Sequence, residues 1–271
     1  MHPTPNQSDF IPVATTTAFG DGDPLDVALQ RIAEHDDIAI VELSIGARPI
    51  HDPATLLDRY RGRFEFIAHH TAPIGDGHSI RPSIDASPLH AARVLLDAGI
   101  TRYSGHPPPR IACDHEAFLA WAQNWWSTLA EHGIEWSVET MYRPRTRSEQ
   151  SSTGGHHLAT PAQVWEFCSF AAGLGWHQPL LIDVSHLRIG LHAGDWTPSD
   201  ITELLRDGPC DELHVSMNDG RRDEHRPTSF DDDVTTWVLP HLGRFRFVVD
   251  EGRRRGDYRV PHPFGASFVR A

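Results

Sequence analysis

Imidazole and carboxylate side chains recur at the ends of apolar, β-rich segments of this sequence, from the pair His69-His70 to Glu251. Neutral imidazole and carboxylate are the usual protein ligands of divalent metal ions. Counting one member of the pair, the candidate ligands are His70, His106, Glu139, Asp183, His186, His214, Asp223, His225 and Glu251. Nine ligands exceed what one ion needs, so we expect two or three ions, with carboxylates bridging them.

Each of these residues also has a simpler interpretation. A lone strand histidine can be a hydrogen-bonded core residue, Asp183 could cap the helix that follows it, and Glu139 could pair with a nearby arginine. Four carboxylates and five imidazoles would be costly to bury together unpaired, which favours the metal interpretation. Because side chains alternate along a strand, only one of His69 and His70 points inward. We expect His70 to be the ligand, with His69 as the alternative.

The segments that must position these ligands are eight apolar, β-rich runs with helical segments between them. Four helical segments begin with a capping side chain followed by proline, at Asp52, Ser87, Thr160 and Thr197. Eight strands that alternate with helices predict a parallel (β/α)₈ TIM barrel, whose carboxyl strand ends meet at one face. The expected strands cover residues 10–16, 38–44, 64–70, 100–106, 136–141, 180–186, 212–217 and 245–251.

No change in composition divides the chain, so we expect a single barrel domain over residues 1–271. Residues 143–157 are polar and rich in serine and glycine, which predicts a loop. The tail after the eighth strand lacks a helical pattern, so the last barrel helix should be short or missing. His78 and His192 follow expected strand ends and could reach a substrate.

Composition narrows the class of protein. The chain has 24 Lys+Arg, all of them arginine, against 37 Asp+Glu, and its formal charge of −13 argues against a nucleic-acid partner. No apolar stretch approaches the ~20 residues of a membrane span, and no signal peptide is visible at the start. The three cysteines have no paired spacing, which indicates reduced thiols. We therefore expect a cytoplasmic protein that contacts no membrane.

The ordered ligand set resembles that of the xylose-isomerase-like metal barrels. Two branches matter: endonuclease IV, a trinuclear zinc enzyme that cleaves DNA at abasic sites, and the multinuclear non-heme iron-dependent oxidases, which modify peptides in natural-product pathways. His186 stands where the oxidases use asparagine and is the endonuclease-like choice. The oxidase-like motifs are Ser104-Gly105-His106, Glu139-Thr140, Leu181-Ile182-Asp183-Val184-Ser185-His186 and Asp223-Glu224-His225-Arg226-Pro227.

This resemblance implies an iron- and O₂-dependent oxidase that holds two or three iron ions and acts on a peptide or amino-acid-like metabolite. The alternatives are a zinc or manganese phosphoesterase, a metal-dependent sugar isomerase or epimerase, and a metal-binding barrel without activity. The acidic charge weakens the case for DNA cleavage. The absence of lysine removes the base that some isomerase barrels use.

Arginines cluster just past the ligand strands, although the chain is acidic overall. Guanidinium groups bind carboxylate and phosphate well, so we expect a small anionic metabolite or peptide as substrate, with a precursor peptide or partner protein as a further possibility. The alternative is that these arginines are solvated or pair with surface acids. The expected substrate contacts are Arg188, Arg143, Arg222 and Arg253, and their neighbours are Arg145, Arg147, Arg221, Arg226, Arg254 and Arg255.

Overall fold

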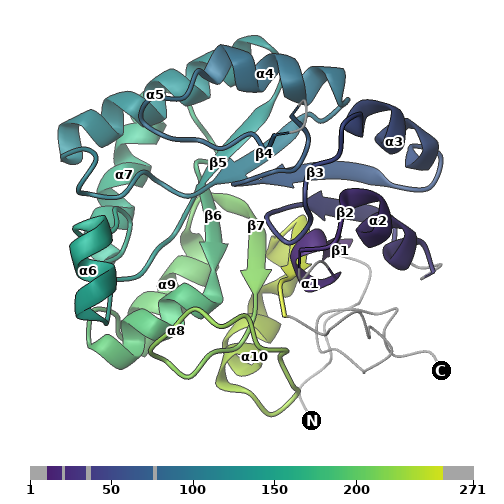
Figure 1. Ribbon diagram of the computed structural model, residues 1–271. Coiled ribbons are helices and arrows are strands. Elements are labelled where there is room, and N and C mark those ends of the chain that lie inside the picture. The colour runs from purple at the N-terminus through teal and green to yellow at the C-terminus, as the bar shows by residue number, and fades with distance from the viewer. Residues whose placement is uncertain (1–10, 20–21, 35–37, 76–77, 253–271) are drawn as a thin grey trace.

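The computed structural model describes residues 11–19, 22–34, 38–75 and 78–252. Its eight parallel strands pair in chain order, and β1 pairs with β8 to close the barrel (Figure 1). This confirms the predicted α/β barrel. The strands are β1 (Ile11–Thr15), β2 (Ile40–Leu43), β3 (Glu65–His69), β4 (Arg102–Gly105), β5 (Glu135–Glu139), β6 (Leu180–Asp183), β7 (Cys210–Val215) and β8 (Phe247–Asp250).

Helices form the outer ring of the barrel in Figure 1. They are α1 (Thr16–Phe19), α2 (Leu25–Ala33), α3 (Pro53–Tyr60), α4 (Pro88–Asp97), α5 (His115–Glu131), α6 (Arg147–Thr153), α7 (Pro161–Gly173), α8 (Val184–Ala193), α9 (Pro198–Asp207), α10 (Asp233–Val238) and the 3₁₀ helix η1 (Leu239–Arg244). Of the helices described, none is both long and apolar enough to cross a membrane.

The four predicted helix starts are confirmed. The side chains of Asp52, Ser87, Thr160 and Thr197 each accept a hydrogen bond from a backbone N–H in the first turn, and a proline follows each of them. Thr197 also shares a reciprocal capping box with Asp200. These caps satisfy N–H groups that have no partner within the helix, so they fix where each helix leaves its loop.

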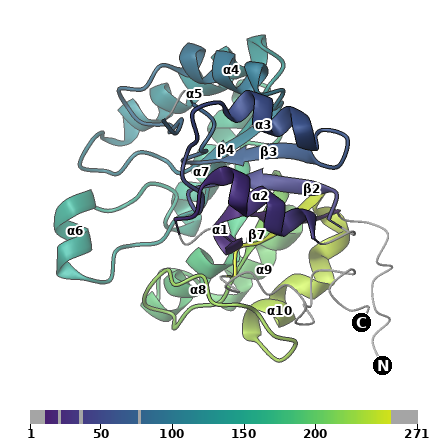
Figure 2. The ribbon, with the colours of Figure 1, turned by 45° about the vertical axis from the view of Figure 1, so that its right-hand side comes forward.

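Two segments differ from the prediction. Residues 143–157, expected to be a loop, contain α6, which Thr146 caps at its start and Gly154 ends with φ 64°. In Figure 2, α6 stands out from the ring of helices. Residues 180–186, expected to be all strand, change to helix after Asp183 because that side chain caps α8. Phe10 and the tail from residue 253 lie outside the described residues.

A small apolar core fills the inside of the barrel, separate from the large core between strands and helices. Its side chains come from four strands, and all are buried: Val13, Ile40, Ile67, Phe247 and Val249. Buried polar side chains lie toward both strand ends, with Arg102 on β4 and Glu212 on β7 toward the amino ends. The barrel interior therefore holds two polar groups beside this apolar packing.

The polar group near the amino ends of the strands is centred on Arg102. Its guanidinium contacts Glu212 at 2.7 Å, Asp211 at 2.5 Å and Glu135 at 2.9 Å, and it lies over the Phe247 ring. Burial alone would lower the pKa of Arg102, but Glu212 and Asp211 outweigh it and raise the pKa. The cation joins β4, β5 and β7 and stays charged, so its role is structural.

Candidate metal centre

Glu139 lies at the centre of the imidazoles that gather at the carboxyl ends of the strands. Its Oε2 atom is 2.8 Å from Nε2 of His106 and 3.2 Å from Nε2 of His69. Its Oε1 atom is 3.3 Å from Nδ1 of His186. One buried carboxylate, at the end of β5, therefore faces imidazoles that come from three other parts of the barrel.

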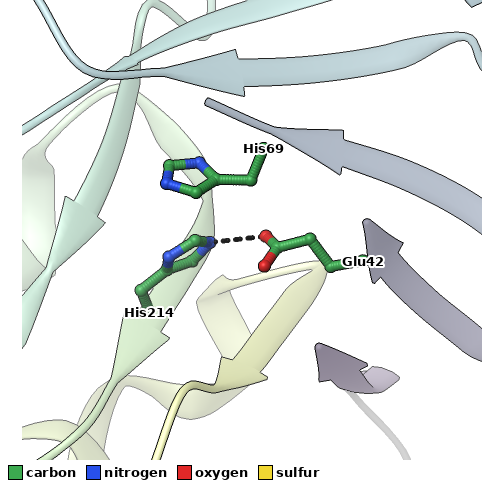
Figure 3. A group of neighbouring side chains, drawn as sticks. All are labelled: Glu42, His69 and His214. Atoms are coloured by element: carbon green, nitrogen blue, oxygen red, sulfur yellow. Dashed lines mark ion pairs between the residues drawn. The ribbon is translucent and has the colours of Figure 1, made fainter. Parts of the chain in front are cut away.

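His214, on β7, lies between two further carboxylates. Its Nε2 atom is 3.0 Å from Oε2 of Glu42, and its Nδ1 atom is 3.3 Å from Oε1 of Glu251. Figure 3 shows the Glu42 carboxylate facing the His214 ring, with the His69 ring beside it. Glu42 is not among the ligands expected from the sequence. Its signal is the alternation along β2, which directs Ile40, Glu42 and Ser44 to the same side.

Asp223 and His225 bring the loop between β7 and α10 onto the same cluster. Oδ2 of Asp223 is 3.4 Å from Nε2 of His186 and 3.1 Å from Nε2 of His225. Nδ1 of His225 lies 3.5 Å from Oε2 of Glu251. These two residues are less buried than the strand residues, so they form the solvent side of the cluster.

Asp183 serves both roles that the sequence suggested for it. Its Oδ1 atom accepts hydrogen bonds from the backbone N–H groups of Ser185 and His186, at 2.6 and 3.0 Å, and so caps α8. Its Oδ2 atom is buried without a hydrogen-bond partner and faces the cluster. Because α8 begins directly after β6, His186 lies in its first turn and not, as expected, at a strand end.

The inward member of the histidine pair is His69, which corrects the expectation for His70. The His69 ring is buried, and its Nδ1 atom lies 3.0 Å from Oγ of Ser104. His70 has a φ of 41° and stacks on His106 at 3.8 Å between ring centroids. Its Nδ1 atom accepts the His106 backbone N–H, which leaves the ring beside the cluster. The geometry therefore favours His69 over His70 as the ligand.

The possible ligand atoms form four overlapping groups, each with three atoms within 4.8 Å of one another. The overlap arises because His69, Glu139, Asp183 and His214 each belong to two groups. The groups are Glu42–His69–His214, His69–His106–Glu139, Glu139–Asp183–His186 and Asp183–His214–Glu251. Such sharing is the arrangement expected of neighbouring ions with bridging ligands.

Several of these donor atoms are buried without a hydrogen bond, which tests the fit of metal ions to the site. Nitrogens lie within 3.2 Å of Oε2 of Glu139, yet their orientation gives that oxygen no hydrogen bond. Buried polar atoms without partners are rare in proteins. The atoms in this state are both carboxylate oxygens of Glu42, Oε2 of Glu139, Oδ2 of Asp183, Nε2 of His186, and Nδ1 of His214 and His225. This mixed nitrogen and oxygen set fits zinc, manganese or iron ions.

The electrostatics of the cluster show how its charges balance without a metal. Burial alone would raise the pKa of Glu139, but His106 and His69 outweigh it and hold the pKa well below its usual range. Burial, with Glu139 nearby, raises the pKa of Asp183 to about 7. Burial alone would lower the pKa of His225, but Glu251 and Asp223 raise it to about 11. Protons on the imidazoles therefore balance the carboxylates, and bound cations would take their place.

A cavity of about 170 Å³ gives access to the cluster from the mouth of the barrel. It is lined by Thr17, Ser44, Ile45, His69, His70, His106, Glu139, His186, Asp223, His225 and Glu251. Hydroxyl groups and an isoleucine therefore stand on one side of the opening, with candidate ligands on the other.

Among the rim arginines that the structure describes, two pair with acidic neighbours. Arg188 is mostly buried, and its Nε donates to Asp233 at 3.0 Å while its Nη1 donates to the Asn218 carbonyl at 2.8 Å. Arg143 pairs with Asp195 at 2.9 Å. The alternative expectation, pairing with acidic neighbours, describes these two better. Arg222 is exposed, and its backbone N–H donates to Asp219; Arg253 lies outside the described residues.

His78 and His192 were expected to reach a substrate at the mouth of the barrel. His78 and His192 are absent from the residues that line the metal cavity. The His192 ring instead lies so close to Gly220 that a Cβ atom there would stand 2.5 Å from it. Gly220 has a φ of 75°, and the ring fills the space that its missing side chain leaves.

No protein-family model matches this chain, and no curated protein sequence is significantly similar to it. Solved structures share its fold. An AP endonuclease of family 2 from Brucella melitensis aligns with a TM-score of 0.60 at 15% identity, over 91% of this chain and 94% of that one. A D-tagatose 3-epimerase-like protein aligns with a TM-score of 0.57 at 16% identity, over 91% of this chain and 93% of that one. A xylose isomerase domain protein from Alicyclobacillus acidocaldarius aligns with a TM-score of 0.55 at 14% identity, over 89% of this chain and 88% of that one.

Proposed function

We propose that this protein is a multinuclear, divalent-metal-dependent hydrolase of small phosphate esters. The observation that carries the proposal is the overlap of the donor groups through Glu139 and Asp183. Neighbouring divalent ions suit phosphoryl chemistry, because when bound they supply an activated water and stabilise the attacking and leaving oxygens.

Different residues of the cluster would bind the different ions. The group of Glu42, His69 and His214 would hold one ion, and the groups that share Glu139 and Asp183 would hold its neighbours. The Oγ atom of Ser104 orients the His69 ring through its Nδ1 atom. Orientation of this kind fixes which ring nitrogen faces the metal.

The least buried members of the cluster would meet the substrate. The side chains of His106, Asp223 and His225 are 31%, 22% and 17% exposed, whereas those of His69, Glu139 and His214 are almost fully buried. The buried layer excludes water from behind the reacting group. The exposed imidazoles form the surface on which a phosphate group would lie.

The charge of the chain indicates which phosphate ester is suitable. A protein of net charge −13 gains little of the electrostatic affinity that duplex DNA binding needs. The likeness to an AP endonuclease shows a shared fold at 15% identity. We therefore propose a small ester as substrate, in agreement with the small anionic metabolite expected from the sequence.

A metal-dependent sugar epimerase or isomerase is the second candidate, and the placement of two carboxylates favours it. Glu139, at the end of β5, and Glu251, just after β8, each share a donor group with Asp183. Two carboxylates around one ion could remove a proton from one face of a carbon and return it to the other. This chemistry gives no role to His106, Asp223 or His225, so we rank it second.

The iron- and O₂-dependent oxidase expected from the sequence stays a prediction. The donor set accommodates iron, but it accommodates zinc and manganese equally. The three similar structures described above are named as an endonuclease, an epimerase-like protein and a xylose isomerase domain protein. We therefore rank the oxidase below both other candidates.

One preparation distinguishes the three candidates. Protein purified without chelator is analysed for metal content, then assayed with p-nitrophenyl phosphate, with a ketose for epimerisation and for O₂ uptake. Two or three ions per chain with ester hydrolysis support the proposal. One ion with epimerisation supports the second candidate, and iron with O₂ uptake supports the oxidase. A chain that binds no metal would overturn all three.

A further inference from the structure

A second cavity adjoins the metal cavity at the mouth of the barrel. Its volume is about 330 Å³, within the range of small-molecule sites. His70 and His106 line both cavities, so the two cavities are neighbours that share this stacked pair of rings. A substrate whose reacting group lies at the metals would extend its remaining part into this side cavity.

The walls of the side cavity are mainly apolar. Two loops supply them, one after β3 and one after β4, together with Met141 beyond β5 and residues 153 and 156. The apolar wall residues are Pro82, Ile84, Pro107, Pro108, Pro109, Ala112 and Met141. Proline rings and the flat face of the histidine pair suit an aromatic or other apolar group. They offer few hydrogen bonds to the hydroxyl groups of a free sugar chain.

Exposed isoleucines extend this apolar surface around the mouth. Ile45 and Ile111 are each 63% exposed, and Ile84 is 37% exposed. They follow β2, β4 and β3, so each lies on a loop at the carboxyl face of the barrel. Ile45 lines the metal cavity and Ile84 lines the side cavity, so exposed apolar side chains border both openings.

Arg81 is the cation of the side cavity. Among the residues that the structure describes, it forms no salt bridge with an acidic side chain. Ser83 and His156 line the same space, and Asp85 is its one carboxylate. A free guanidinium beside apolar walls suits an anionic substituent.

The loops that carry these walls are held in place by the backbone. Ala72 and Ile80 exchange two hydrogen bonds of 3.0 Å just before Arg81. Gly105, at the end of β4, lets Pro82 of the loop after β3 approach closely, because a Cβ atom on residue 105 would stand 2.6 Å from Cγ of Pro82. The backbone N–H of Arg110 donates to Gly155 at 2.9 Å and fixes the other wall. The cavity is therefore preformed.

From these contacts we infer that the substrate carries an apolar, preferably aromatic, group with an anionic substituent: the apolar group occupies the side cavity and Arg81 binds the anion. The inference rests on the proposed function, because the metal-bound end of the substrate is taken to be a phosphate ester.

Calorimetric binding of three phosphonates to the metal-loaded protein tests this inference. Affinity should rise from methylphosphonate to phenylphosphonate to 4-phosphonobenzoate. Arg81→Gln should weaken 4-phosphonobenzoate by about tenfold or more and leave phenylphosphonate unchanged. Ile84→Ser should weaken both aryl compounds. Arg93→Gln, which replaces an exposed arginine of α4 that lines neither cavity, is the matched control and should change none of them.

The inference is overturned if the three phosphonates bind equally, or if Arg81→Gln leaves 4-phosphonobenzoate binding unchanged. Hydrolysis of the corresponding phosphate esters is measured separately. Binding that depends on Arg81 without hydrolysis would overturn the proposed function and support the side cavity. Hydrolysis that shows no preference for aryl groups and no dependence on Arg81 would support the proposed function and overturn the side-cavity inference.

Discussion

Two groups of buried charged side chains lie inside one barrel and are balanced differently. Near the amino ends of the strands, Arg102 meets three carboxylates in salt bridges of 2.5 to 2.9 Å. Near the carboxyl ends, the described carboxylates pair only with imidazoles, and several donor atoms have no hydrogen bond. The first group is balanced by a permanent cation, and the second by imidazole protons that a metal ion can displace.

This difference teaches how to separate structural charge from functional charge. A buried cluster that satisfies itself stabilises one arrangement of strands and needs no ligand. A cluster that leaves converging acceptors unsatisfied is tolerated where an external cation completes it. The two groups almost touch, because Oε1 of Glu212 lies 3.3 Å from Nε2 of His214. Variants on either side of this contact therefore test the comparison directly.

The largest effect on stability should come from Arg102→Met. Removing the cation leaves Glu212 buried with an uncompensated charge, which costs about 3–5 kcal/mol of unfolding free energy. Urea denaturation of the metal-free protein measures this loss. Metal stoichiometry of the fraction that remains folded should be unchanged, and loss of metal without loss of stability would contradict the assignment.

The next largest effect should come from Glu139→Gln. An amide is a neutral and poor ligand, so metal affinity and activity should fall together by at least ~100-fold. Metal analysis and turnover on the same sample measure both. Glu135→Gln is the control, since Glu135 begins the same strand, is exposed and contacts Arg102 instead. Full metal content in Glu139→Gln would remove Glu139 from the centre.

The histidine pair should differ in its effect on metal binding. His69→Gln removes an inward imidazole, so metal affinity should fall about 10- to 100-fold. His70→Gln should retain the metal, because its ring stacks on His106 outside the donor groups. Competition with a metal-binding dye compares the two variants. The reverse order would restore His70 as the ligand.

Metal affinity should rise with pH. In the metal-free protein the neighbouring carboxylates raise the pKa of His225 to about 11. They also raise the pKa values of His186 and His214 well above their usual range. All three imidazoles therefore hold protons at neutral pH. A metal displaces these protons, and each one displaced makes affinity increase about tenfold per pH unit. Calorimetry in two buffers of different ionisation enthalpy counts the protons released; a count of zero would contradict this charge balance.

The smallest effect should come from Arg188. Its ties to Asp233 and Asn218 predict that Arg188→Ala lowers unfolding free energy by about 1 kcal/mol. KM should stay unchanged, in contrast to the sequence-based expectation of a substrate contact. A raised KM at unchanged stability would return Arg188 to the substrate site.

The fold could be predicted because its signals are local. Capping side chains followed by proline marked four helix starts, and apolar runs marked eight strands. The helix α6 was missed because its sequence, RSEQSST, has no apolar face. Strand β6 was expected to continue to His186 because the apolar run does not show that Asp183 turns back to cap the next helix.

The candidate site was only partly predictable, because its details depend on packing between distant strands. No histidine lies beside Glu42 in the sequence to indicate a metal site, and only the closed barrel brings Glu42 to His214. The choice between His69 and His70 depends on the orientation of β3, which the two identical side chains do not reveal. Arg81 lies in the loop that follows His69 and His70, where no neighbouring motif indicates a site residue.

Closure of the barrel between β1 and β8 has a consequence for assembly. Glu42 comes from the second strand and Glu251 follows the eighth, and both face His214. This donor set is complete only after the last strand has docked against the first, so a chain released before that point lacks the full site. Binding free energy is then available to the finished fold alone, and cellular metal supply would set the balance between mature protein and proteolysis of unfinished chains.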